Sequence, residues 1–220
     1  MTMHRHLPLV ALLAATTLSV LVGSASANRL SVTNRSIRMT WSSLEFRGPV
    51  TIRCRLTLEG TLHENTIAKV ERSLIGYVTA ARFQRPCTGG TMWSYNGSEV
   101  NEVLGGTLPT SLPWHITYEG FNGALPTPTA IRILLALWRY EVRGVIFGIP
   151  VLCTYRTGAA GNATGTANLG SGGRIESLSL SGNIASEDPS PCASLAFQSP
   201  AGDGRVTLLG TTNAISITLI

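Results

Sequence analysis

The chain has 220 residues, with 17 lysines and arginines against 12 aspartates and glutamates, for a formal net charge of +5. This length is enough for one large domain or two small ones with a substantial hydrophobic core. The basic residues are scattered and form no run, so the sequence argues against nucleic-acid binding, which uses a concentrated basic stripe. A weak attraction to an anionic wall or membrane surface is compatible with the surplus of positive charge.

Residues 1–27 have the three regions of a secretory signal in the usual order. A basic start precedes the apolar run LPLVALLAATTLSVLV (7–22), and SASA (24–27) supplies the small residues of a cleavage site. We therefore predict cleavage after Ala27 and a secreted or surface-located domain at 28–220 with no membrane span. The alternative is an uncleaved anchor, but a run of 16 apolar residues is shorter than the roughly 20 that a spanning helix needs.

Alternation of apolar and polar residues dominates the exported part and predicts β-strands. SIRMTW (36–41) alternates in this way, and after the next two serines the phase changes, which predicts a β-bulge. In TIRCRLTLEG (51–60) the apolar side chains and Cys54 occupy every second position. The same period recurs in ESLSLSG (176–182) and AISITLI (214–220).

Two segments allow more than one interpretation. NTIAKVERSLIG (65–76) begins with a possible helix cap, Asn65, and has apolar residues at helical spacing, so a helix is predicted there, with a strand almost equally supported. TAIRILLALWRYEV (129–142) is a central strand or a helix. Its β-branched and aromatic content favours a strand.

Turn signals rich in glycine and proline separate these runs, so we predict an all-β protein, an antiparallel β-sandwich or barrel. WSYNGSEV (93–100) is interpreted as a hairpin around its Asn-Gly pair. A strand with a cysteine, a polar stretch, a second strand and a Pro-Cys pair occur twice, which suggests two related halves, 28–126 and 127–220. Ordinary β-sheet periodicity without duplication accounts for the same pattern and is the favoured interpretation.

Four cysteines lie in the exported part: Cys54, Cys87, Cys153 and Cys192. An even number in an oxidising compartment predicts two disulfides. Three pairings are open. We favour Cys54–Cys87 and Cys153–Cys192, because each bond then closes a loop within one half. A zinc site is the alternative, but the wide spacing and the lack of a Cys-x-x-Cys pair argue against a metal.

The segment LPWHITYEGFNGALP (112–126) concentrates aromatic and titratable residues. In a strand, Trp114 and Tyr118 share one face and His115 and Glu119 share the other. Four strand residues separate the latter pair by about 13 Å between Cα atoms, too far for one metal ion. We therefore favour core packing for the aromatic face and a solvent-exposed polar face over a catalytic site.

Candidates for catalysis are few. The mature chain has two histidines, His63 and His115, two aspartates and no Gly-x-Ser-x-Gly motif, so we predict neither a catalytic residue nor a cofactor. A hydrolase that uses a histidine with glutamates is the open alternative, and it requires these groups to converge in a cleft.

Binding of a polysaccharide is the other open possibility. Trp93 and Tyr95 lie beside a turn and on one face, where their rings can stack on sugars, although large aromatic residues usually fill cores. The candidate binding residues are Trp93, Tyr95, His63, His115 and Glu119.

Several stretches resemble a group of uncharacterised secreted proteins from high-GC Gram-positive bacteria. The similar stretches are LEGTLH (58–63), TIAKV (66–70), LIGYVT (74–79), CTGG (87–90), LPWHITYEGFNGALP (112–126) and VLC (151–153). The resemblance implies an exported, β-rich bacterial domain with paired cysteines, and it implies no activity. We therefore expect a secreted, non-enzymatic protein of the cell envelope with a structural or binding role. The first alternative is a module that binds cell-wall polysaccharide, and the second is an extracellular hydrolase.

Overall fold

The computed structural model describes residues 29–48, 51–89, 91–93, 112–146, 148–157, 163–188 and 192–220. The strands are β1 (Arg29–Val32), β2 (Ser36–Arg47), β3 (Thr51–Leu62), β4 (Thr66–Ala68), β5 (Leu74–Thr88), β6 (Thr91–Trp93), β7 (Trp114–Asn122) and β8 (Ala130–Ala136). They continue with β9 (Arg139–Ile146), β10 (Ile149–Arg156), β11 (Ala163–Leu169), β12 (Ile175–Ser186), β13 (Leu195–Gln198), β14 (Arg205–Leu208) and β15 (Ile217–Leu219). Within these ranges the helical structure is one 3₁₀ turn, Ser171–Gly173.

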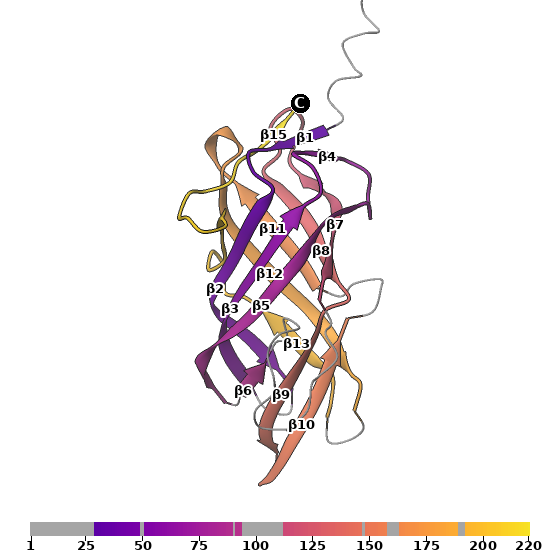
Figure 1. Ribbon diagram of the computed structural model, residues 1–220, viewed down its shortest axis with the longest axis vertical. Coiled ribbons are helices and arrows are strands. Elements are labelled where there is room, and N and C mark those ends of the chain that lie inside the picture. The colour runs from indigo at the N-terminus through magenta and orange to yellow at the C-terminus, as the bar shows by residue number, and fades with distance from the viewer. Residues whose placement is uncertain are drawn as a thin grey trace, which may run out of the picture.

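Eight antiparallel strands form a closed barrel (Figure 1). Their order is β11-β8-β7-β5-β3-β2-β13-β12, and pairing of β11 with β12 closes the ring. The predicted all-β antiparallel fold is therefore confirmed, as a barrel. The two predicted halves contribute four neighbouring strands each, β2, β3, β5 and β7 from the first and β8, β11, β12 and β13 from the second. Their common origin stays a prediction.

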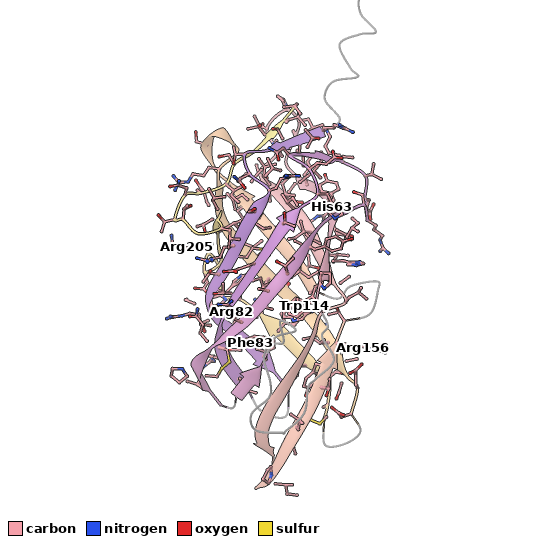
Figure 2. The ribbon with its side chains drawn as sticks, in the orientation of Figure 1. His63, Arg82, Phe83, Trp114, Arg156 and Arg205 are labelled. Atoms are coloured by element: carbon pink, nitrogen blue, oxygen red, sulfur yellow. A yellow bond between two sulfur atoms is a disulfide. The ribbon has the colours of Figure 1, made fainter. Side chains whose placement is uncertain are left out.

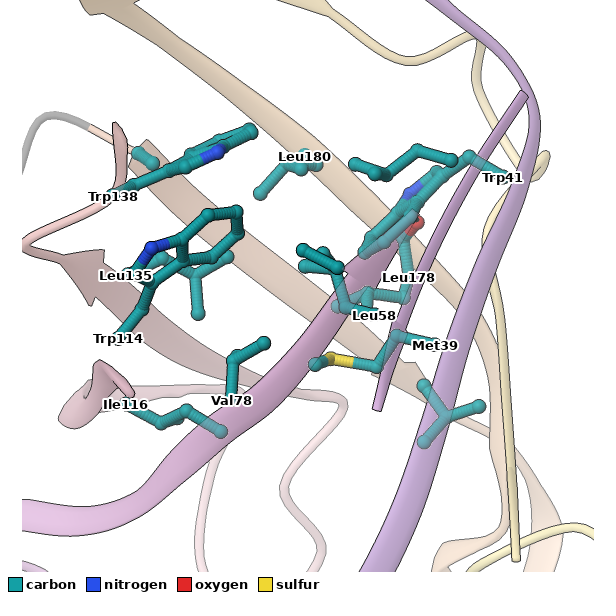
Figure 3. Close-up of a cluster of buried hydrophobic side chains, with 14 of the residues drawn as sticks. Met39, Trp41, Leu58, Val78, Trp114, Ile116, Leu135, Trp138, Leu178 and Leu180 are labelled. Carbon is teal, nitrogen blue, oxygen red and sulfur yellow. Dashed lines mark hydrogen bonds between the residues drawn. The ribbon is translucent and has the colours of Figure 1, made fainter. Parts of the chain in front are cut away.

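The predicted alternation gives the barrel its filled interior. Buried residues occupy every second position of β2 as far as Trp41, and after Ser42 and Ser43 the alternation resumes at Leu44. This is the predicted bulge. Trp114 and Trp138 pack against each other inside, with ring centroids 5.3 Å apart (Figure 3). Close packing of this kind makes the barrel a solid core rather than an open channel.

Both favoured disulfides are present. Cys54–Cys87 joins β3 to β5, and Cys153–Cys192 joins β10 to the segment before β13. The described part of the chain has no free cysteine.

A second sheet, β6-β9-β10, extends from the barrel at β12. It connects there through two residue pairs, one of them Tyr155 with Ser186. Burial, and after it the negative charge of Asp188, raises the pKa of Tyr155 to about 12, so this phenol is neutral at physiological pH.

The two ambiguous segments are both extended. The helix predicted at 65–76 is wrong: the segment contains the short strand β4, a turn and the start of β5. Ile67 pairs with Leu30 of β1. Pairing with a neighbouring strand therefore determines the extended conformation of this segment, in spite of its helical spacing of apolar residues. The run 129–142 is strand, as favoured, but it is divided into β8 and β9 at Leu137, whose φ is 60°.

A three-stranded sheet, β15-β1-β4, lies at one end of the barrel (Figure 1). Beneath it is a cavity of about 60 Å³ lined only by apolar side chains, which come from this sheet and from the barrel. Among the described residues, no helix has the length and apolar character needed to cross a membrane. The signal predicted at 1–27 lies outside the described residues.

Filling this cavity is expected to stabilise the protein. Ala167 lines it from β11 and is buried, and valine at this position adds two methyl groups in a strand-compatible side chain. We expect Ala167→Val to raise the free energy of unfolding by about 0.5–1.5 kcal/mol, measured by urea denaturation. The matched control is Ala196→Val at an exposed strand position, which reports β-propensity alone. An equal gain in both variants would contradict the cavity-filling argument.

Candidate functional site

Three planar side chains form a row across β3, β5 and β7. His63 follows the last residue of β3, Tyr77 lies in β5 and His115 lies in β7 directly opposite Tyr77. The centroid of the Tyr77 ring is 4.8 Å from that of His63 and 5.4 Å from that of His115, with interplanar angles of 56° and 62°. We call these three residues the ring row.

The ring row lies on the outer surface of the barrel. Leu62, Val78 and Trp114, which are neighbours of the three residues in the chain, are buried in the core. Because successive strand side chains point to opposite faces, the rings point away from the core. His63 is exposed, and Tyr77 and His115 are half-buried, so each ring offers part of its surface to a ligand (His63 is labelled in Figure 2).

A groove of about 230 Å³ begins at one end of the ring row. His63 lines it together with Glu64 and Thr66, which flank the turn between β3 and β4, and with Ser73 just before β5. The hydroxyl oxygen of Ser73 is buried and has no hydrogen-bond partner among the described residues. The groove therefore continues the ring row with side chains whose polar groups are able to form hydrogen bonds with a ligand.

The structure brings together only part of the predicted set of binding residues. His63 and His115 belong to the ring row, on either side of a tyrosine that the sequence analysis did not select. Glu119 lies four residues along β7, and its Oε1 atom is buried without a hydrogen-bond partner in the described part of the chain. Trp93 is the last residue of β6, but its side chain, like Tyr95 and the predicted hairpin at 93–100, lies outside what the structure describes.

The other tryptophans fill the core, as favoured. Trp41, Trp114 and Trp138 are each 0% exposed, so none of them presents a ring to solvent. The division of faces predicted for 112–126 is also confirmed, because Trp114 and Tyr118 are buried while His115 and Glu119 are half-buried. Stacking on sugars therefore depends, within the described residues, on rings other than these tryptophans.

The ring row has the composition of a recognition surface. Its phenol and imidazoles donate and accept hydrogen bonds at their edges and present flat faces for stacking. Neither imidazole forms an ion pair with a carboxylate among the described residues. Nowhere in the described part of the chain do three or more histidine, cysteine, aspartate or glutamate side chains lie close enough together to hold a metal ion.

Tyr77 was missed because the signal for it is not local. It lies in LIGYVT, where a glycine and a register shift interrupt the alternation that would have assigned it to the outer face. Tyr77 contacts both histidines only because β5 lies between β3 and β7. Periodicity within one strand does not specify which strands are its neighbours.

Comparisons of the chain with protein-family models, with curated proteins and with solved structures found no match. The resemblance to secreted proteins of high-GC Gram-positive bacteria therefore stays a prediction from the sequence.

Proposed function

We propose that this is an exported, non-enzymatic bacterial protein of the cell envelope that binds a polysaccharide through the ring row. The observation that carries the proposal is the arrangement of His63, Tyr77 and His115 as adjacent rings on the outside of the barrel. The signal-like residues 1–27 support export, and two disulfides are compatible with an extracellular protein.

The chemistry of the ring row suits a chain of sugars. The faces of pyranose rings carry C–H groups that pack on aromatic faces, and their hydroxyls bond to groups at the ring edges. The ring centroids are 4.8 and 5.4 Å apart and the rings are inclined at 56° and 62° to each other, so the ring row offers a polysaccharide both ring faces and polar ring edges within a short distance. The support on three strands of a closed barrel keeps the rings in place before the ligand arrives, which lowers the entropic cost of binding.

Binding to immobilised cell-wall and plant polysaccharides tests the proposal. We expect the protein to be retained, and we expect Tyr77→Ala to weaken binding by about 1 kcal/mol or more, a several-fold rise in Kd. Thr79→Ala is the matched control, since Thr79 is the next exposed residue on the same face of β5. Retention that Tyr77→Ala leaves unchanged, or no retention on any glycan, would count against the proposal.

The non-enzymatic part has its own test. A broad panel of hydrolase substrates is expected to show no turnover. Hydrolysis that disappears in His115→Ala would instead show that the ring row is an active site.

A further inference from the structure

Two irregularities interrupt the strand pairing of the barrel wall at the same level, one on each side of β3. Toward β2, the bulge residues Ser42 and Ser43 both lie opposite Arg55. Toward β5, Cys54 alone lies opposite residues 85–87. Bulges re-aim side chains, interrupt the ladder of hydrogen bonds and are frequent beside functional sites.

Both irregularities are held in place by specific bonds. Asp203 accepts hydrogen bonds from the hydroxyl of Ser42 and from the backbone N–H of Ser43, the latter at 2.9 Å. On the other side, the Cys54–Cys87 disulfide crosses from β3 to the interrupted part of β5. These bonds therefore hold both irregularities in place within the barrel wall.

Between the two irregularities is a groove of about 450 Å³, which we call the β3 groove. Its polar lining comes from Ser42 and Ser43, from Arg53 and Arg55, and from Gln84 and Thr88. The groove is separate from the ring row, because it lies near the start of β3 whereas His63 follows the end of that strand, and no residue of the ring row lines it. The lining combines guanidinium donors with hydroxyl and amide groups that both donate and accept, a composition that suits an anionic and hydroxylated ligand.

The two arginines of the groove differ in how they are engaged. Arg53 donates to Glu45, which Arg47 also contacts, and these hydrogen bonds, first from Arg47 and then from Arg53, hold the pKa of Glu45 below its usual value. Arg55 instead donates to the neutral side-chain oxygen of Gln84 at 3.4 Å and has no carboxylate partner among the described residues. Its charge is therefore available to a ligand.

The described charges beside the groove favour an anionic ligand. Among the described residues, the guanidinium groups of Arg47, Arg53 and Arg55 stand beside the carboxylates of Glu45 and Asp203. Arg47 and Arg53 both contact Glu45, so Arg55 is the group that offers its positive charge to an anion.

We propose that the β3 groove is a binding site for an oxyanion carried by a polyhydroxylated molecule, with Arg55 as the residue that binds the charge. The planar guanidinium accommodates a carboxylate through two parallel hydrogen bonds, and the serine, threonine and glutamine side chains bind the surrounding hydroxyls. This site goes beyond the proposed polysaccharide binding by the ring row and does not depend on it.

Titration of the oxidised full-length protein with glucuronate, followed by NMR, tests the site. Glucuronate is expected to shift the backbone amide signals of residues 42–43, 55 and 84, and glucose, the neutral control, is expected to leave them unchanged. Inorganic phosphate lacks the hydroxyl-bearing ring that the serine, threonine and glutamine side chains would bind, so it is expected to bind more weakly than glucuronate. Equal shifts with glucose, or tighter binding of phosphate, would overturn the proposal.

A pair of charge variants separates the site from general attraction. Arg55→Gln is expected to weaken glucuronate binding at least about tenfold, because a charge-assisted hydrogen-bond pair is lost. Arg82→Gln removes one positive charge from an exposed position on β5 that does not line the groove, and it is expected to leave binding nearly unchanged. Equal weakening by both variants would mean diffuse attraction, and the proposed site would be wrong.

Discussion

Replacement of Gly204 by alanine is expected to lower the free energy of unfolding by about 3 kcal/mol or more. A Cβ atom at this position would overlap both the carbonyl oxygen of Leu178 and the Nε1 atom of Trp41. These two atoms form a buried hydrogen bond of 2.8 Å, and the backbone N–H of Leu178 donates to the carbonyl of Gly204 at 2.9 Å. The added methyl group therefore has no space unless a buried hydrogen bond breaks or a fully buried indole moves.

Each way of relieving this overlap is costly. An unsatisfied buried polar group costs about 1–3 kcal/mol, and overpacking of a core costs a similar amount. Urea denaturation monitored by tryptophan fluorescence measures the resulting loss in the free energy of unfolding. Gly202→Ala is the control in the same turn: its Cβ meets no atom within 4 Å, and its φ of 73° costs an alanine only about 1–2 kcal/mol. Destabilisation by Gly204→Ala that is no larger than that by Gly202→Ala would contradict the prediction, because the overlap would then cost only about 1–2 kcal/mol.

Reduction of both disulfides is expected to remove most of the stability of the protein. The bonds close loops with sequence separations of 33 and 39 residues, and the chain-entropy model assigns about 3.5–4 kcal/mol to each. Their sum is comparable with the total stability of a typical domain, about 5–15 kcal/mol. We therefore expect the urea midpoint to fall sharply when dithiothreitol is added to the native protein.

Paired cysteine variants assign the effect to each bond. Cys54→Ala with Cys87→Ala is expected to destabilise the barrel itself. Cys153→Ala with Cys192→Ala is also expected to accelerate hydrogen exchange in β9 and β10, because β10 keeps only two residue pairs with β12. A variant without any cysteine controls for other effects of the reductant. A midpoint that dithiothreitol does not change would contradict the argument.

The features that depend on a single strand were predictable from the sequence. Alternation assigned Ile52, Cys54 and Leu56 to the core, and the change of phase after Trp41 marked the bulge. Cysteine spacing led to the correct disulfides because each bond joins positions within one predicted half. Local periodicity determines which face a side chain occupies, so these predictions needed no knowledge of the neighbouring strands.

The features that depend on which strands are neighbours were not predictable. A sandwich and a barrel use the same alternation, and only the pairing of β11 with β12 distinguishes them here. The same limit explains the candidate site: two histidines were selected from their chemistry, but the tyrosine between them becomes visible only when β5 is placed beside β7. The β3 groove likewise requires two irregularities in different strand pairs to lie at one level.

Closure of the barrel has a consequence for biogenesis. The ring cannot be completed until residues 195–198 of β13 reach β2, which begins at residue 36. If the protein is exported amino end first, as proposed, unpaired strand edges therefore stay exposed until β13 has been delivered. During that interval neighbouring copies can join edge to edge. A chain that ends before β13 lacks one of the eight barrel strands, so the edges of β2 and β12 that face β13 stay unpaired and can pair with another copy.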